Sequence, residues 1–226
     1  GLSYTSKDII VTIGAKHAIY NALSVTLEPG DEVIIPAPYW ASYPDTTLAG
    51  AGEPVIVPCA ETDDFKLTPA ALEAAITPRT RWLILNSPTN PTGSAYTAAD
   101  FRALADVLLR HPHVLLMTDD IYEHIRFGSG ENPHPVAIEP ALKSRTLVIN
   151  GVSKTYAMTG WRIGWAAGPE DLIAALDMLQ SQSVTNACSV SQAAALAALR
   201  GEQGFLDEWV AVYRQRRDLA LGLINA

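Results

Sequence analysis

The sequence contains little cysteine, a deficit of basic residues and no long apolar run, and each absence excludes a class of protein. Its two cysteines, Cys59 and Cys188, lie far apart without metal-ligand spacing, and the chain opens without a secretory signal. This pattern favours a reduced, cytoplasmic protein over a disulfide scaffold, and it predicts no metal site. The 16 Lys and Arg residues against 24 Asp and Glu give a formal net charge of −8, which argues against nucleic acid as a partner. No apolar run reaches the roughly 20 residues of a membrane-spanning helix, so no membrane association is expected.

The composition that is present is typical of a globular protein. Of the 226 residues, 48% are hydrophobic and 18% are charged, which is enough apolar material for one large domain with a substantial core. Short β-branched runs alternate along the chain with segments whose apolar residues recur at helical spacing. The strand-like runs are 9–13, 32–35, 54–57, 81–85, 114–118 and 146–149, and the helix-like segments are 15–27, 42–49, 69–76, 98–110, 170–180, 191–200 and 202–223.

This alternation predicts an α/β fold with a mainly parallel sheet that carries helices on both faces. Ligands of such sheets bind beyond the carboxyl ends of the strands, so the residues that follow each strand are the candidates for a functional site. After position 169 the pattern becomes helical, and the alanine-rich run 193–198 fits an ordinary buried helix.

The stretch 150–165 holds the most informative residues. Lys154 lies between small and aromatic residues, with a hydroxyl beside it at Ser153 and with Arg162 eight positions later. A lysine in this position could simply cap a turn. The planar guanidinium of Arg162, however, suits a phosphate or carboxylate, and a lysine amine in such a setting can form a Schiff base with a carbonyl compound such as pyridoxal phosphate (PLP). The stretch therefore indicates an amine nucleophile beside an anion site.

Three other strand ends carry candidate residues. Gly14, Ala15 and Lys16 open a helix, where free backbone N–H groups suit a phosphate, although a glycine in a tight turn explains the same residues. Trp40 lies in a proline-rich loop and either stacks on a flat ring or packs in the core. The loop 86–93 contains two asparagines and two prolines, which is typical of a rigid functional loop and also of an ordinary turn.

Two neighbouring carboxylates, Asp119 and Asp120, follow the strand-like run 114–118. A carboxylate at the end of a buried strand is costly unless it meets a cation or several hydrogen-bond donors, and a protonated ring nitrogen would serve. Strand alternation places the two side chains on opposite faces of the sheet. Only one of them can therefore meet such a ring.

Together these motifs resemble, in order and at similar spacing, those of the PLP-dependent aminotransferases of class I and II, the fold type I family. The sequence looks most like the bacterial aspartate aminotransferases. The matching motifs are 14–16, 38–40, 86–93, 119–122 and 153–162. The resemblance implies a mainly parallel seven-stranded sheet with helices on both faces, PLP as cofactor, and a homodimer, because 181–186 is similar to a loop near the family's dimer interface. Ala187 and Asp120 depart mildly from the usual Pro and Glu.

The resemblance also implies a role for each candidate residue. Lys154 would bind PLP as a Schiff base and move a proton during the reaction, and Asp119 would keep the pyridinium nitrogen protonated. Asn90 and Tyr122 would bond the phenolic oxygen of the ring, and Tyr122 counts with Lys154 and Asp119 as catalytic. Trp40 would stack on the ring, and Trp40 and Asn90 would also contact substrate. The phosphate would be held by the turn at Gly14, the backbone N–H groups of Ala15 and Lys16, the Ser153 hydroxyl and the Arg162 guanidinium. Relatives aim the asparagine with a cis peptide bond, so the bond before Pro91 is predicted to be cis.

By the same resemblance, residues 1–226 correspond to the PLP-binding large domain. The family's N-terminal segment and its C-terminal small domain, whose arginine grips the substrate α-carboxylate, are absent, and the chain opens at Gly1 without an initiator methionine. We therefore expect little turnover from this chain alone. The predicted activity is transfer of the amino group of aspartate to 2-oxoglutarate, with an amino acid and a 2-oxo acid as substrates. The alternatives are a non-catalytic PLP-binding domain of a transcription regulator and a PLP-dependent lyase.

Overall fold

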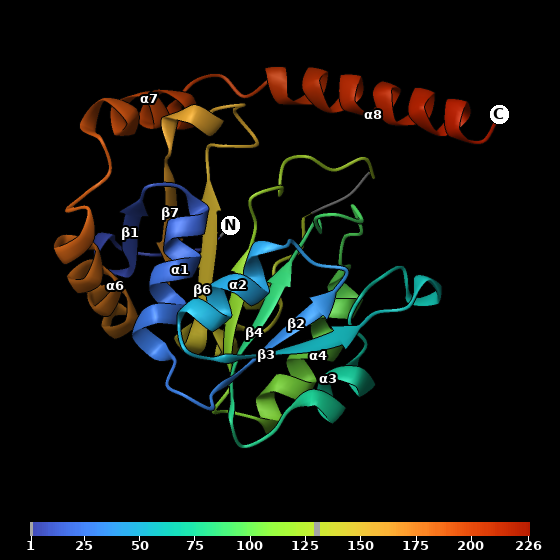
Figure 1. Ribbon diagram of the computed structural model, residues 1–226. Coiled ribbons are helices and arrows are strands. Elements are labelled where there is room, and N and C mark those ends of the chain that lie inside the picture. The colour runs from blue at the N-terminus through green and yellow to red at the C-terminus, as the bar shows by residue number, and fades with distance from the viewer. Residues whose placement is uncertain (1, 129–131) are drawn as a thin grey trace.

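A seven-stranded sheet forms the centre of the fold in the computed structural model, which describes residues 2–128 and 132–226. The strand order is β1-β7-β6-β5-β4-β2-β3 (Figure 1). The bounds are β1 (Ile9–Thr12), β2 (Glu32–Ala37), β3 (Glu53–Pro58), β4 (Thr80–Asn86), β5 (Leu115–Asp119), β6 (Thr146–Gly151) and β7 (Gly164–Ala167). Strands β2 to β6 pair in parallel, whereas β7 runs antiparallel to both β6 and β1. The prediction of a mainly parallel sheet is confirmed.

The strand β7 escaped the sequence pattern, although the six predicted strands are all present. Its four residues are glycine, tryptophan and two alanines, none of which is β-branched, so local propensity gives little signal. It forms because both of its edges pair, with β6 on one side and β1 on the other. Long-range pairing therefore creates this strand, and local sequence does not.

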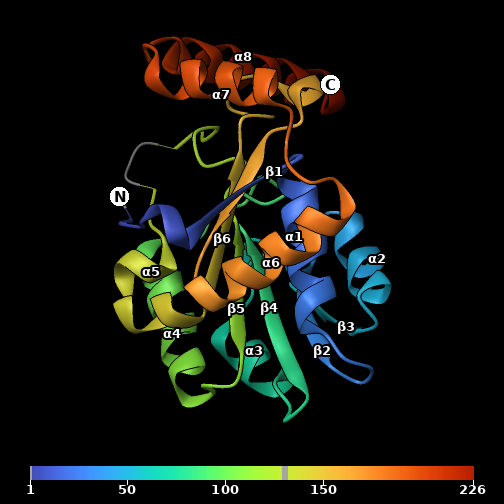
Figure 2. The ribbon, with the colours of Figure 1, turned by 90° about the vertical axis from the view of Figure 1, so that its left-hand side faces the viewer.

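Helices cover both faces of the sheet (Figure 2). They are α1 (Ala15–Thr26), α2 (Ser42–Ala49), α3 (Pro69–Ala75), α4 (Ala98–Arg110), α5 (Pro135–Ile138), α6 (Glu170–Ser183), α7 (Ser189–Arg200) and α8 (Phe205–Ile224). The short α5 was not predicted. One core lies between the sheet and α1, α2 and α6, and a second lies between the sheet and α3, α4 and α5. Successive strand residues alternate between them: Val33 and Ile35 belong to the first core and Ile34 to the second, as the two-residue period of a strand requires.

The alanine-rich helix α7 is more exposed than predicted, whereas α8 is a helix as predicted and no burial was predicted for it. The alanine-rich run in α7 was expected to be buried, but Ala195 is the one buried residue of that helix. Ala195 packs with Val152 and Ile163 of the lysine-bearing stretch, while Val190 on the same helix is 68% exposed. In α8 no residue is buried, and Figures 1 and 2 show both helices at one end of the molecule. The prediction was wrong because helical spacing alone does not say whether anything packs on an apolar face.

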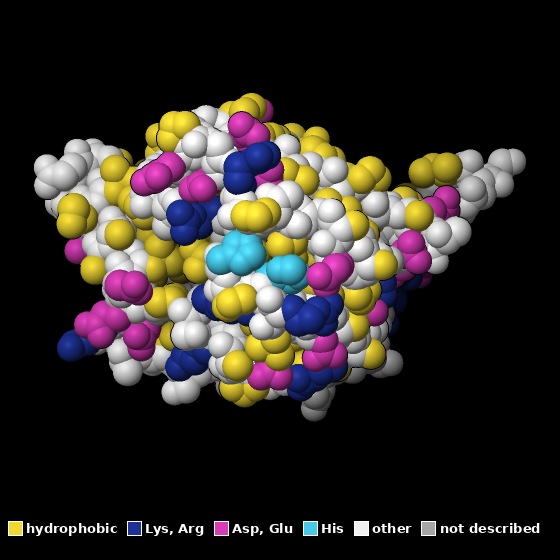
Figure 3. Space-filling model, turned by 90° about the horizontal axis from the view of Figure 1, so that it is seen from below, with side chains coloured by type: hydrophobic (Ala, Val, Ile, Leu, Met, Phe, Trp, Pro, Cys, Tyr) yellow, Lys and Arg dark blue, Asp and Glu magenta, His cyan; other side chains and the backbone are white. Residues whose placement is uncertain are grey.

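Charges of both signs are interspersed over the face that Figure 3 shows, rather than gathered by sign. Among the residues that the structure describes, no helix is both long enough and apolar enough to cross a membrane. The same residues contain no cluster of histidine, cysteine and carboxylate side chains that could hold a metal ion. Cys59 and Cys188 are free thiols.

Arg145 ties the entry of β6 to the neighbouring elements. Its guanidinium donates hydrogen bonds to the carbonyl oxygens of Leu108 (2.6 Å), His111 (3.0 Å) and Val114 (2.6 Å). Two of these carbonyls belong to the end of α4 and its cap, where helix carbonyls have no partner within the helix. This side chain thus joins the end of α4 to the segments that lead into β5 and β6. Asp119 is the last residue of β5, and Lys154 lies in the turn that follows β6.

Replacing Arg145 by Met should lower the free energy of unfolding by about 3 kcal/mol, because three carbonyls lose a charged donor. Urea denaturation of the purified chain measures this change. Arg200→Met, at an exposed position of α7, is the matched control and should change stability by less than about 0.5 kcal/mol. Equal effects of the two substitutions would contradict the role given to Arg145.

Candidate active site

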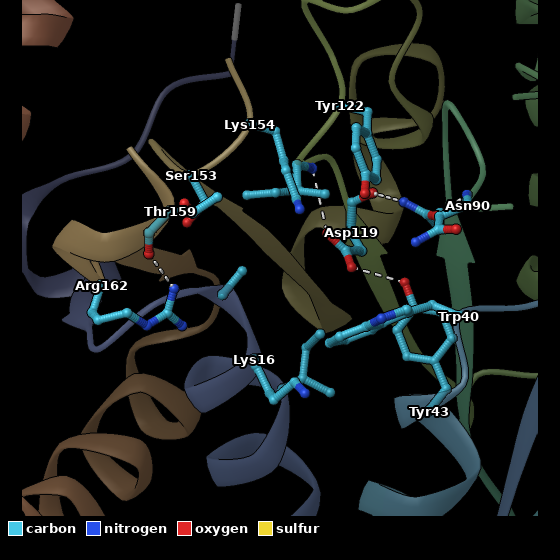
Figure 4. A pocket seen from close by; sticks show the side chains of 14 residues that line it. Lys16, Trp40, Tyr43, Asn90, Asp119, Tyr122, Ser153, Lys154, Thr159 and Arg162 are labelled. Atoms are coloured by element: carbon cyan, nitrogen blue, oxygen red, sulfur yellow. Dashed lines mark hydrogen bonds between the residues drawn. The ribbon is translucent and has the colours of Figure 1, made fainter. Parts of the chain in front are cut away.

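A pocket of about 290 Å³ opens beyond the carboxyl ends of β4, β5 and β6, against the first turn of α1 (Figure 4). This is where the strand-end rule placed the site. Every predicted site residue except Gly14 lines the pocket, and Gly14 directly precedes the first of them. The lining residues are Ala15, Lys16, Ile19, Trp40, Tyr43, Asn86, Asn90, Asp119, Ile121, Tyr122, Ser153, Lys154, Thr159 and Arg162.

Asp119 is the last residue of β5 and is 4% exposed. Its Oδ2 accepts a hydrogen bond from the Tyr43 hydroxyl at 2.8 Å, and its Oδ1 accepts one from the Ile121 amide at 3.3 Å. Burial disfavours the charged carboxylate and raises the pKa of Asp119 to about 6, although the Tyr43 hydrogen bond opposes that rise. A buried carboxylate with only two donors favours a cationic ligand in the pocket.

Asp120 points to the opposite side of the sheet, as strand alternation predicted. Its Oδ2 lies 3.2 Å from Nε2 of His134 and 3.5 Å from Oγ1 of Thr118. Burial raises the pKa of Asp120 too, against the effect of the His134 hydrogen bond. Asp120 is therefore not available to a ligand in the pocket, and Asp119 is.

Tyr43 was missed by the sequence analysis. It lies in the first turn of α2, is almost completely buried, and stands edge-on to Trp40 with ring centroids 5.4 Å apart. Its contact with Asp119 joins residues 76 positions apart. The one available signal was its place three residues after Trp40, and that signal also fits an ordinary core aromatic residue.

Two asparagines connect the ends of β4 and β5. The Asn86 side chain donates a hydrogen bond to the backbone carbonyl oxygen of Asp119 at 2.7 Å and accepts one from the backbone N–H of Asn90 at 2.8 Å. The Asn90 side chain in turn donates to the Tyr122 hydroxyl (Figure 4). The Asn90–Pro91 peptide bond is cis, which confirms the prediction; the bonds before Pro38 and Pro88 are cis as well and were not predicted. The loops after β4 and β5 thus present Asn90 and Tyr122 together on one wall.

Lys154 reaches into the pocket from the turn that follows β6. Its Nζ lies 5.9 Å from the ring centroid of Tyr122, and Figure 4 shows the side chain pointing toward Asp119 and Tyr122. Burial raises the pKa of Tyr122, the negative charge of Asp119 adds to the rise, and the Asn90 hydrogen bond opposes it. The amine, the phenol and the carboxylate therefore face a common space.

The opposite end of the pocket is a cationic cradle. Arg162 donates from Nη1 to the Thr159 carbonyl at 2.8 Å and from Nη2 to the Ile13 carbonyl at 3.3 Å. Gly14 is the N-cap of α1 with φ of +93°, and no side chain caps the helix there, nor does any acidic residue lie in its first turn. A Cβ at Gly14 would lie 2.8 Å from Cζ of Arg162, so the absence of a side chain lets the guanidinium reach the helix N-terminus. Uncapped amides and an arginine together suit a phosphate.

Comparison with known proteins shows the family to which the chain belongs. A model of the family described as "Aminotransferase class I and II" matches residues 1–225. The chain belongs to this family. Class I and II aminotransferases depend on PLP, which confirms the resemblance and the cofactor predicted from the motifs.

Relatives of high similarity are bacterial aminotransferases. The chain is 56% identical over 225 residues to the aspartate/prephenate aminotransferase of Cereibacter sphaeroides, covering 100% of this chain and 56% of the relative. The crystal structure of the aspartate aminotransferase from Rhizobium meliloti superposes with a TM-score of 0.98 at 53% identity, covering 100% of this chain and 56% of that one. The aspartate aminotransferase from Thermus thermophilus with maleate gives 0.93 at 41% identity, covering 98% and 58%. The chain thus spans just over half the length of the relatives it matches.

In this member of the aminotransferase family, Asp119 makes stability depend on pH. The folded chain holds a proton at Asp119 up to a pKa of about 6, against an ordinary pKa of 3.8 for an aspartate. This contribution to stability is therefore fully present below about pH 4 and is lost as the pH rises through about 6. For the cofactor-free chain, the free energy of unfolding relative to Asp119→Asn should fall by about 2 kcal/mol between pH 4 and pH 7.5. Urea titrations across this range test it, and parallel pH profiles for the two proteins would contradict it.

Tyr43→Phe provides a second test in the same assay. Because the Tyr43 hydroxyl lowers the pKa of Asp119, its removal should move the pH-dependent loss of stability to higher pH. Tyr20→Phe, at an exposed position of α1, is the control and should leave the profile of the wild type unchanged. A profile that Tyr43→Phe does not shift would show that the hydrogen bond has no influence on Asp119.

Proposed function

We propose that the protein is a PLP-dependent aminotransferase that takes the amino group of aspartate and passes it to 2-oxoglutarate. The observation that supports this most is the meeting of a lysine amine, a buried carboxylate and an anion cradle in one pocket. Relatives at more than half identity are named aspartate or aspartate/prephenate aminotransferases. The Thermus structure is described as the enzyme with maleate, and maleate, like aspartate, is a dicarboxylate. The names favour this activity over a regulator domain or a lyase.

The residues present fit PLP at each of its three polar ends. The cradle of α1 amides and Arg162 suits the phosphate, and the Arg162 guanidinium lies close to these amides because Gly14 has no Cβ. Asp119, buried and short of donors, would hold a proton on the ring nitrogen. Asn90 and Tyr122 would bond the phenolic oxygen. When bound, PLP supplies an electron sink for negative charge at the substrate Cα.

The chain's own residues would orient the reactants and move protons. Trp40 is fixed edge-on by Tyr43 and would cover one face of the ring, where it also keeps water away. Lys154 Nζ would hold the cofactor through its carbonyl carbon, whose oxygen leaves as water, and as a free amine it would take a proton from the substrate Cα. Tyr122, held by Asn90, would steer that amine and keep the phenolic oxygen in place. Trp40 and Asn90 would also contact the substrate.

The wider organisation is proposed on the same basis. Residues 1–226 would form the large PLP-binding domain of a longer homodimeric protein, because the chain covers just over half of its relatives. The exposed apolar side chains of α7 and α8, among them Val190 and Leu223, support further packing partners at that end. Two distant free cysteines support a cytoplasmic location.

Lys154→Ala should abolish covalent attachment of PLP while leaving phosphate-dependent binding, because the cradle is made by other residues. Borohydride reduction of the PLP-loaded chain, followed by peptide mass spectrometry, locates the attached lysine. Lys7→Ala is the control, since Lys7 lies on the surface near Glu170 and should retain the label at Lys154. A reduced adduct on Lys16, the other lysine of the pocket, would contradict the assignment.

Aspartate and 2-oxoglutarate should yield oxaloacetate and glutamate when the longest expressed form of the protein is assayed. The Asp119→Asn variant should be slower by about 100-fold or more, because a ring nitrogen without its carboxylate holds a proton poorly and makes a weaker electron sink. Prephenate in place of 2-oxoglutarate tests the second substrate named for the Cereibacter relative. Release of ammonia without glutamate would show a lyase and overturn the proposal.

A further inference from the structure

Three glycines from separate segments meet behind the phosphate cradle. Gly14 precedes α1, Gly151 ends β6, and Gly164 begins β7. In the sheet register Gly164 lies opposite Gly151 on one side and Thr12 on the other. Gly164 is thus the point where β7 passes between β6 and the turn that leads into α1.

The backbone of β7 touches the first turn of α1 at Gly164. A Cβ added to Gly164 would collide with the Ala15 amide nitrogen and would lie 2.6 Å from the Gly14 carbonyl carbon and 2.9 Å from the Ala15 Cα. All three atoms are backbone, so no side chain can rotate to make room. Only glycine permits this separation, and we call the Gly164 packing against Gly14 and Ala15 the glycine contact.

The glycine contact joins the two halves of the cradle. One half is the N-terminus of α1, whose first amides have no partner within the helix. The other half is Arg162, two residues before Gly164, whose backbone is left-handed at φ of 54°. That turn brings the guanidinium over Gly14, where it donates to the Ile13 carbonyl. Moving Gly164 away from α1 would separate the amides from the guanidinium.

Gly151 acts on the same assembly from the other side. A Cβ at Gly151 would lie 2.9 Å from the Ile163 carbonyl oxygen and 3.1 Å from the Gly164 Cα. The turn after Gly151 carries Ser153 and Lys154. Gly151 therefore lets β6 and β7 approach closely at the point where β7 meets α1.

We propose that Gly164 is a positioning residue: the glycine contact sets the phosphate-binding end of α1 against Arg162 and thereby creates the preference for phosphorylated over unphosphorylated pyridoxal. The inference rests on the proposed cofactor site and adds a residue that does not line the pocket. Its physical basis is that hydrogen bonds weaken steeply as their geometry departs from the ideal. A misplacement of about 1 Å can lower the reaction rate of an enzyme about 100-fold. The ring and the carbonyl group, bound elsewhere in the pocket, do not depend on this contact.

The test compares PLP with pyridoxal, which lacks the phosphate but keeps the ring and the carbonyl carbon. Absorbance titrations of the 226-residue chain give a dissociation constant for each ligand. In Gly164→Ala the ratio of the pyridoxal constant to the PLP constant should fall about tenfold or more, while pyridoxal binding itself changes little. Gly160→Ala is the control, because its Cβ would meet no atom within 4 Å, and it should keep the wild-type ratio.

Gly151→Ala tests the contact from its other side and should lower the ratio in the same direction, since its Cβ would press on the Gly164 Cα at 3.1 Å. Circular dichroism checks that each variant is folded; if Gly164→Ala does not fold, the ratio of Gly151→Ala decides. A wild-type ratio in the folded variants overturns the inference, and so does an equal loss of affinity for both ligands, which is what a merely structural role gives. A wild-type chain that binds neither ligand overturns the proposed function itself.

Discussion

Burial of the Asp119 carboxylate at the end of β5 is the constraint on which the rest of the site depends. A charge in that position is held by one phenol and one amide, and burial raises its pKa to about 6. An anion so poorly solvated attracts a cationic group far more strongly than one in water does. The pocket therefore has a fixed polarity, with a carboxylate at one end and the arginine cradle at the other.

The sheet brings the residues at the two ends of the pocket to one edge. Because β4, β5 and β6 are parallel, Asn86, Asp119 and Ile149 lie side by side near the same edge, and the loops that follow carry Asn90, Tyr122 and Lys154 toward one space. The chain stays at this edge from Gly151 to Arg162, and the antiparallel β7 begins there at Gly164, beside α1. The walls that carry Asn90, Tyr122 and Lys154 are thus extensions of strands that are paired on both sides, which limits their motion.

Close backbone contacts at glycine and directed hydrogen bonds, rather than apolar packing, set the distances between the polar groups of the pocket. Gly14 leaves room for a guanidinium and Gly164 leaves room for a helix backbone. Asn86 bridges two strand ends through both of its polar atoms. On the far side of the sheet, Asp120 and His134 hold the same segment. A site for an anion beside a cationic ring needs such directional contacts, because apolar packing does not fix the orientation of polar groups.

The sequence by itself determined the alternating elements, the strand ends that carry Asp119 and Lys154, and the opposite facing of Asp119 and Asp120, because periodicity and strand alternation are local properties. Motif spacing also identified the family and most of the residues that line the pocket. Only the tertiary structure decided that β7 is a strand, that Tyr43 supports Asp119, that α7 is largely exposed, and that Gly164 meets α1. Each of these depends on whether segments distant in the chain contact one another, and the presence or absence of such a contact leaves no signal in the local pattern of either segment.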